Sequence, residues 1–210
     1  MEEYDIDELN ELEDRRSIPY DEYFDNMDLT EEEKEKRKSF AEKLDDVMLF
    51  IFGLIIVMNK YNKMNKEYIR NQMYERFSDV VLEFMGIDDY LANYISLSTD
   101  EILDTTYRNI DDNFFLSLDR AMLISENEAN GVFGYDEFVS AIRQGKTMKE
   151  WVDVRDHRER KTHLAVGGKK IPILQPFVVG NSLMLFPKDR VTYSADMKEI
   201  AGCRCTVRYY

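Results

Sequence analysis

The hydrophobic period of the chain changes near Gly145, and this change sets the fold class. Between Tyr61 and Met85, apolar residues recur every three or four positions, as one face of an amphipathic helix requires. From Trp151 to Val154 the pattern becomes that of a strand. Helices followed by short strands, rather than alternating with them, indicate an α+β protein. We expect a mainly helical N-terminal two-thirds followed by a small α+β C-terminal module.

Local signals give the expected ends of the helices. A Ser/Thr-x-x-Glu spacing predicts one helix start at Thr30 and another at Ser98. Gly86 predicts the end of the helix that contains Met85. The pair Asn130-Gly131 predicts a break, followed by a short helix over 135–144.

The run from Val47 to Met58 is twelve residues long and carries no charge. A membrane-spanning helix needs about twenty apolar residues, so this run predicts no membrane span. It indicates a helix surrounded by other helices, or one buried at a subunit interface.

The last quarter contains the strand signals. Gly167-Gly168 predicts a tight turn, and 169–174 and 182–186 are expected strands. We expect a short helix at 194–201 and a C-terminal strand at 203–210.

Charge divides the chain at about the same place. Residues 143–210 carry 14 Lys and Arg against 7 Asp and Glu, a net charge of +7, whereas residues 1–142 carry 14 against 35, a net charge of −21. Opposite signs predict either separate surfaces, of which the basic one faces nucleic acid, or attraction between the two parts of one chain. Two cysteines cannot build a disulfide framework, which favours an intracellular origin.

Residues 1–28 are acidic and tyrosine-rich and show no sustained period, so we expect an acidic extended arm there. Its aromatic residues either dock onto a neighbouring subunit or belong to a frayed terminus. They are Tyr4, Tyr20, Tyr23 and Phe24.

Both histidines, both cysteines and the only tryptophan fall between Trp151 and Cys205. In order, the stretch contains Trp151, Asp156-x-Arg158-x-Arg160-x-x-His163, Gly168, Pro187-x-Asp189 and Cys203-Arg204-Cys205. This order and spacing resemble the phage Mu F-like, or head morphogenesis, family of minor head (minor capsid) proteins over roughly residues 147–208. The sequence departs from the family pattern at Gly202, where a polar residue, commonly asparagine, is expected.

The sequence patterns and this resemblance together predict three regions: an acidic extended arm at 1–28, a helical domain at 29–145 and a Mu F-like module at 146–210. The resemblance implies a virion structural protein and not an enzyme, associated with the portal protein and other head proteins during head morphogenesis. Such a protein assembles in the host cytoplasm, remains inside the capsid, and contacts packaged double-stranded DNA or aids its ejection. No small-molecule substrate is expected.

The charged motif residues have two interpretations. On an extended segment Asp156, Arg158 and Arg160 would share a face. Asp156 would then orient an arginine that grips a phosphate or carboxylate, or the group would form a structural Asp–Arg network. In the structural case Arg204 pairs with an acid such as Asp156 or Asp189.

His163, Cys203 and Cys205 are candidate metal ligands, with His157 or an aspartate as a fourth. The alternative is that no cofactor binds and both cysteines are buried as small apolar groups. A nucleophilic Cys–His pair lacks a recognisable nucleophile elbow.

Nucleic-acid contact is expected from the basic residues of the module: Arg158, Arg160, Lys169, Lys170 and Arg204. The alternative function is a small, toxin-like nuclease or phosphate-ester enzyme that uses His163 with Arg158 and Arg160. An adaptor that makes no nucleic-acid contact is a third hypothesis.

Overall fold

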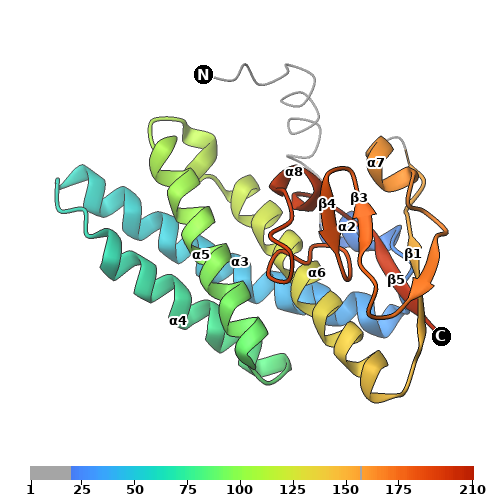
Figure 1. The fold of residues 1–210 in the computed structure, drawn as a ribbon. Helices are drawn as coiled ribbons and strands as arrows, with labels where there is room; N and C mark the ends of the chain where they lie inside the picture. Colours follow the sequence, from blue (N-terminus) through green and yellow to red (C-terminus); the bar gives the residue numbers. More distant parts are fainter. Residues whose placement is uncertain (1–19, 157) are drawn as a thin grey trace.

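The computed structural model describes residues 20–156 and 158–210 (Figure 1). Two elements precede or interrupt the long helices: α2 (Tyr20–Asp25) and η1 (Asn113–Leu116). The long helices are α3 (Glu31–Lys60), α4 (Lys66–Phe84), α5 (Asp89–Arg108) and α6 (Leu118–Arg143). The C-terminal module contains β1 (Met148–Val152), α7 (Lys161–Leu164), β2 (Lys170–Pro172), β3 (Phe177–Val179), β4 (Ser182–Met184), α8 (Met197–Ile200) and β5 (Thr206–Tyr209). The predicted α+β class is confirmed.

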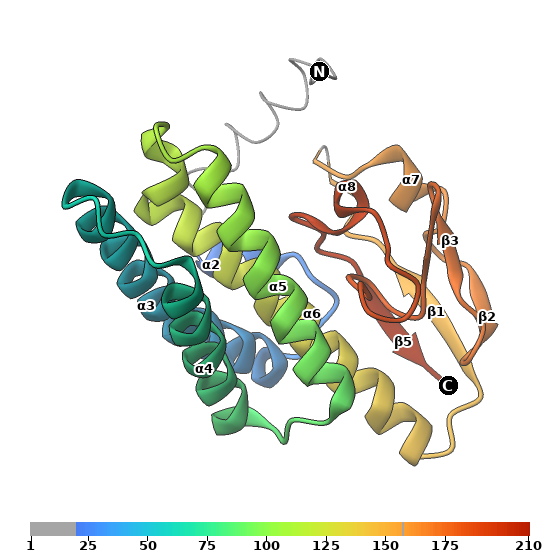
Figure 2. The same cartoon turned by 60° about the vertical axis from the view of Figure 1, so that its left-hand side comes forward.

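The four long helices form a bundle on one side of the molecule, and the strands lie on the other (Figures 1 and 2). α3 begins with the predicted capping box, in which Thr30 and Glu33 exchange hydrogen bonds. It packs between α4 and α6, and Phe40 meets Phe77 and Phe133 edge to face. These contacts bury Phe40 and Phe77 completely, whereas Tyr61 and Tyr68 are 64 and 45% exposed.

The uncharged run at 47–58 is buried on one face only. Ile51 and Ile55 are in the core, whereas Phe50, Ile56 and Val57 are 43, 47 and 53% exposed. The expectation that other helices of the same chain surround this run is therefore wrong, and burial at a subunit interface stays a prediction. Across residues 20–156 and 158–210, no helix is both long enough and apolar enough to cross a membrane.

The part of the arm that the structure describes is not extended. Residues 20–25 form α2, and Tyr23, Phe24 and Met27 are buried in the bundle core. Two of the aromatic residues expected on a neighbouring subunit therefore pack within their own chain, because burying them repays the entropy of ordering the segment. Tyr4 lies outside the described residues.

The predicted helix start at Ser98 is wrong. The helix begins at Asp89, where Asp88 caps it by accepting a hydrogen bond from the Leu91 N–H. Ser98 lies in its middle, fully buried, and donates to Glu128 at 2.7 Å. The capping spacing at Ser98 is coincidental because a stronger cap stands ten residues earlier.

The predicted break at Asn130-Gly131 is also wrong, because α6 continues through both residues. A Cβ at position 131 would collide with the Tyr94 hydroxyl of α5. Gly131 is therefore a site of close helix approach, and the tertiary contact outweighs glycine's low helix propensity.

The module is built on a three-stranded antiparallel sheet in the order β2-β1-β5, with β3 and β4 as a separate hairpin. Trp151 of β1 stands opposite Val207 of β5. The expected strands at 169–174, 182–186 and 203–210 are shorter than predicted, and β3 was not predicted. The turn signal is correct, since Gly168 has φ +76° and donates its N–H to the Trp151 carbonyl.

Polar groups join the module to α6. The amide of Asn127 accepts from the Gly202 N–H at 2.9 Å, and Asn130 donates to the Cys203 carbonyl at 3.2 Å. Arg190 of the module reaches Glu101 and Glu128 of the bundle at 3.3 and 3.4 Å. The basic C-terminal module and the acidic helical bundle therefore attract each other at this boundary.

Glu126 of α6 predicts a pH-dependent stability. It is fully buried, and neither carboxylate oxygen accepts a hydrogen bond from the described residues. Burial raises its pKa from 4.5 to about 8, against the opposing charge of Lys188. Between these two values the folded chain keeps a proton that the unfolded chain releases, so the free energy of unfolding should fall as pH rises, by up to about 1.4 kcal/mol per unit.

Urea unfolding between pH 5 and 8 measures this slope, and Glu126→Gln should flatten it. Glu75→Gln, at an exposed position of α4, is the control and should leave the slope intact. An equal slope in wild type and Glu126→Gln would contradict the assignment.

Candidate metal centre

His163, Cys203 and Cys205 meet inside the module. His163 lies on the single turn of α7, and the two cysteines precede β5. Because the intervening chain is extended, Cys203 and Cys205 point to the same face while Arg204 points away. The Nδ1 atom of His163 is 3.5 Å from Cys203 Sγ and 3.3 Å from Cys205 Sγ. All three ligand atoms lie within 4.8 Å of one another, and the group can hold a metal ion.

Trp151 forms the wall of this cluster. Its ring meets the His163 ring edge to face at 5.7 Å and the Phe177 ring at 5.2 Å. Trp151, Cys203 and Cys205 belong to one apolar core, and His163 is only 2% exposed. The rare residues of the motif therefore form one buried group.

Two glutamates border the cluster, and the sequence did not single out either. Glu199 accepts from His163 Nε2 at 3.1 Å and from the Thr162 hydroxyl at 2.8 Å. Glu159 accepts from the Cys205 thiol at 3.6 Å and from the Arg155 N–H at 2.8 Å. Among 42 acidic residues, these two are marked in the sequence only by their positions, four residues before His163 and four residues before Cys203.

The cluster polarises its own thiols. Burial alone would raise the pKa of Cys203, but the Cys205 hydrogen bond and the charge of His163 bring it well below its ordinary value. The hydrogen bond to Cys203 raises the pKa of Cys205, and burial adds to this. Burial lowers the pKa of His163, yet Cys203 outweighs it and the net direction is upward. The Cys203 thiol therefore loses its proton more readily than the Cys205 thiol.

The expected pairing of Arg204 with Asp156 is confirmed. Arg204 is 9% exposed at its side chain, and Asp156 also accepts from the Arg158 N–H at 3.0 Å. Arg160 donates to the Ala201 carbonyl at 2.6 Å. However, these residues lie in a loop and not on an extended strand, so the shared face predicted for Asp156, Arg158 and Arg160 does not form. The structural interpretation fits Asp156 and Arg204.

The Pro187-x-Asp189 segment also has a structural place. Asp189 is fully buried, accepts from the Leu185 and Thr192 N–H groups at 3.0 Å, and accepts from Tyr90 of α5 at 2.9 Å. It therefore fixes a loop against the bundle and is not the partner of Arg204.

Gly202 explains the departure from the family pattern. Its φ is +62°, in the left-handed region. Glycine adopts this region freely, and asparagine does so more readily than most residues. Either residue satisfies the backbone before Cys203, so the departure changes a side chain but not the local conformation.

The expected nucleic-acid contacts divide into two groups. Lys169 and Lys170 are exposed at the turn before β2, where Lys170 lies 3.3 Å from the centre of the Tyr210 ring. Arg158, Arg160 and Arg204 are partly or largely buried. His157 lies outside the described residues.

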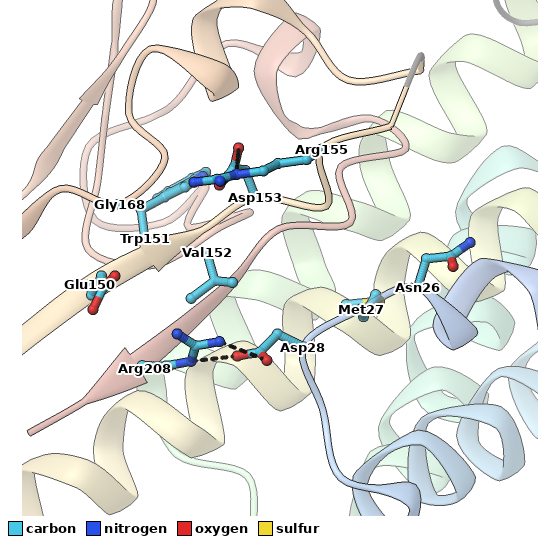
Figure 3. Close-up of a pocket in the computed structure, with 10 residues that line it drawn as sticks. All are labelled: Asn26, Met27, Asp28, Glu150, Trp151, Val152, Asp153, Arg155, Gly168 and Arg208. Atoms are coloured by element: carbon cyan, nitrogen blue, oxygen red, sulfur yellow. Dashed lines mark hydrogen bonds and ion pairs between the residues drawn. The ribbon is translucent and has the colours of Figure 1, made fainter.

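A hollow of about 430 Å³ lies between residues 26–28 and the β1–β5 part of the sheet (Figure 3). Arg208 of β5 donates to both carboxylate oxygens of Asp28, at 2.7 and 2.9 Å. Arg155 pairs with Asp153 at 3.3 Å beside the same hollow. Each of these arginines is paired with an aspartate. The Arg208–Asp28 pair attaches the segment after α2 to the sheet.

The chain matches no protein-family profile, no curated protein and no solved structure.

Proposed function

We propose that the chain is a phage virion structural protein, a minor head protein that acts in head morphogenesis near the portal. The observation that carries this proposal is the convergence of the motif residues. Trp151, His163, Cys203 and Cys205 form one buried group, although their positions span 55 residues of sequence. We expect such a buried group if the motif residues together build one docking module. The protein would assemble in the host cytoplasm and remain inside the capsid.

The surface proposed for the portal protein or other head proteins is the exposed face of α3, formed by Phe50, Ile56 and Val57. Exposed apolar patches of this kind are typical of interaction sites. The neighbouring residues Phe40, Phe77 and Met73 are buried within the chain and are not part of this surface.

The double variant Ile56→Asp/Val57→Asp should lose binding to an immobilised portal ring of the same phage. Burying each side chain contributes about 1.5–3 kcal/mol, so the dissociation constant should rise at least about tenfold. The unfolding midpoint should change little, because both residues are exposed in the isolated chain.

Leu174→Asp/Val178→Asp is the matched control, since both residues are exposed apolar positions in the module. It should bind the portal ring as wild type does. A wild-type chain that the ring does not retain would overturn the portal assignment, and equal losses in both double variants would exclude the α3 face.

Contact with packaged DNA is assigned to Lys169 and Lys170, the exposed members of the basic set. Such contact would be independent of sequence and would weaken with salt. Arg204 is left out because Asp156 already pairs with it.

The nuclease alternative is less well supported. A general base must reach the proton that it removes. His163 is buried, the cysteines engage its Nδ1, and Glu199 engages its Nε2. Neither ring nitrogen faces solvent in a way that would serve a phosphate ester.

We propose zinc as the ion that His163, Cys203 and Cys205 hold. Two thiolates and one imidazole are a donor set that zinc favours, and the buried, apolar surroundings suit a structural ion. A structural ion is consistent with a virion protein, which needs a stably folded module and converts no substrate.

A further inference from the structure

The three candidate ligands supply one nitrogen and two sulfurs, whereas a structural zinc site has four protein ligands. We propose that Glu159 is the fourth ligand of a closed tetrahedral site and that Glu199 positions His163 for coordination. This inference rests on the zinc site proposed above. It gives roles to two glutamates to which the family resemblance assigns none.

The distances already match those of a tetrahedral zinc site. Zinc–sulfur bonds of about 2.3 Å and zinc–nitrogen bonds of about 2.0 Å place the two donor atoms about 3.5 Å apart at a tetrahedral angle. The His163 Nδ1 atom lies 3.5 and 3.3 Å from the two sulfurs. Both nitrogen–sulfur distances therefore fit a shared ion, and all three ligand atoms lie within 4.8 Å of one another.

The histidine is oriented as a metal ligand normally is. Its Nδ1 faces the sulfurs, and its Nε2 lies 3.1 Å from Glu199, whose carboxylate also accepts from Thr162. A carboxylate on the far nitrogen fixes the tautomer and makes the coordinating nitrogen more basic. Glu199 is thus a positioning residue and not a ligand.

Glu159 approaches the cluster from the loop before α7. Its Oε1 atom is 3.6 Å from Cys205 Sγ, close to the spacing of two ligands on one ion. Its carboxylate does not lie within 4.8 Å of all three ligand atoms, so the Glu159 side chain must rotate toward the ion in order to coordinate it. With two thiolates and one carboxylate around a divalent ion, the site carries a net charge of −1. Arg158 and Arg160 line the same small hollow and offset that charge.

A closed site would link three segments that few backbone hydrogen bonds join: the loop at 153–160, α7, and the residues before β5. This gives the ion a structural function. Metal removal should then loosen the module around Trp151 and the two cysteines more than the helical bundle, whose main core is a different cluster.

Cobalt(II) binding by the full chain tests the assignment, because the visible absorption of cobalt reports its coordination number. Wild type should take up one equivalent with the intense absorption of a four-coordinate site. Glu159→Ala should bind more weakly, and water in the fourth position should change the spectrum. Glu199→Gln should bind about 10–100-fold more weakly with an unchanged spectrum. Glu150→Ala, on β1, is the control and should match wild type.

A second measurement needs no variant. Thiocyanate added to the cobalt-loaded wild type should leave the spectrum unchanged, because a closed site has no exchangeable position. A spectrum that responds to thiocyanate, or a Glu159→Ala chain with wild-type affinity and spectrum, would overturn the role of Glu159 while leaving the three-residue site intact. A wild-type chain that takes up neither cobalt nor zinc would overturn the metal site itself, and the portal-binding experiment would still stand.

Discussion

Arg190→Met is expected to lower the free energy of unfolding by about 3–5 kcal/mol at pH 7, because it leaves a buried carboxylate without its partner. Arg190 is 6% exposed and Glu128 is 2% exposed, and their charged atoms lie 3.4 Å apart. Ser98 and Asn127 also donate to Glu128, at 2.7 and 3.1 Å, but neither supplies a positive charge. The variant would therefore retain the hydrogen bonds from Ser98 and Asn127 to Glu128, but lose the hydrogen bond and the positive charge of Arg190.

The loss should be smaller at low pH. Burial alone would raise the pKa of Glu128, and Arg190 is the main group that holds it below its ordinary value. Without Arg190 the folded-state pKa should rise above the unfolded value. Stability is then fully present at low pH and is lost as pH rises through the new folded-state pKa. Urea unfolding of the variant at pH 5 and pH 7 measures this difference.

Two further variants isolate the charge effect. Arg190→Met combined with Glu128→Met should recover most of the lost stability, since an apolar pair of similar volume replaces a buried ion pair at little cost. Lys198→Met, at an exposed lysine of the same module, should change stability by no more than about 0.5 kcal/mol. If Arg190→Met unfolds no more easily than Lys198→Met, the buried pair does not join the module to the bundle.

The fold class and the membership of the site could be predicted because they depend on local patterns. A change from helical to strand period and a cluster of rare residues are both visible in one sequence. The Arg204–Asp156 pair could also be predicted, since an arginine between two buried cysteines needs a nearby acid. The start of α5 was set by a local signal as well, the Asp88 cap, which the spacing at Ser98 obscured. The continuity of α6 through Gly131 was not predictable in this way, because it depends on a close contact with Tyr94 of α5 that neither segment specifies alone.

The two glutamates at the metal centre illustrate the same limit. Glu159 and Glu199 are 40 residues apart and resemble the other acidic residues of an acidic chain. Their significance depends on which side chains the fold brings to the His163 ring and to Cys205. Composition, which drew attention to histidine and cysteine because they are rare, gives no such signal for glutamate.

Trp151→Ala is expected to lower the stability of the C-terminal module by about 3–5 kcal/mol, the range for removing a fully buried large aromatic side chain. Trp151 is 0% exposed and contacts both His163 and Phe177 through its ring. Its removal would leave a cavity at the centre of a core that contains few other large side chains. The surrounding short strands cannot close such a cavity without losing their pairing with β1.

The only tryptophan also makes the test specific to the module, because wild-type fluorescence reports the surroundings of Trp151 while far-ultraviolet circular dichroism reports mainly the helices. Urea unfolding of wild type followed by both signals establishes whether the module and the bundle unfold together. Trp151→Ala is then followed by circular dichroism, with a chelator present so that lost packing is not confused with lost metal. Tyr193→Ala, at a 43% exposed aromatic residue of the module, is the control and should change stability by no more than about 0.5 kcal/mol. A loss below about 1 kcal/mol for Trp151→Ala would mean that the module does not depend on this core, and the convergence of the motif residues would then lose its physical importance.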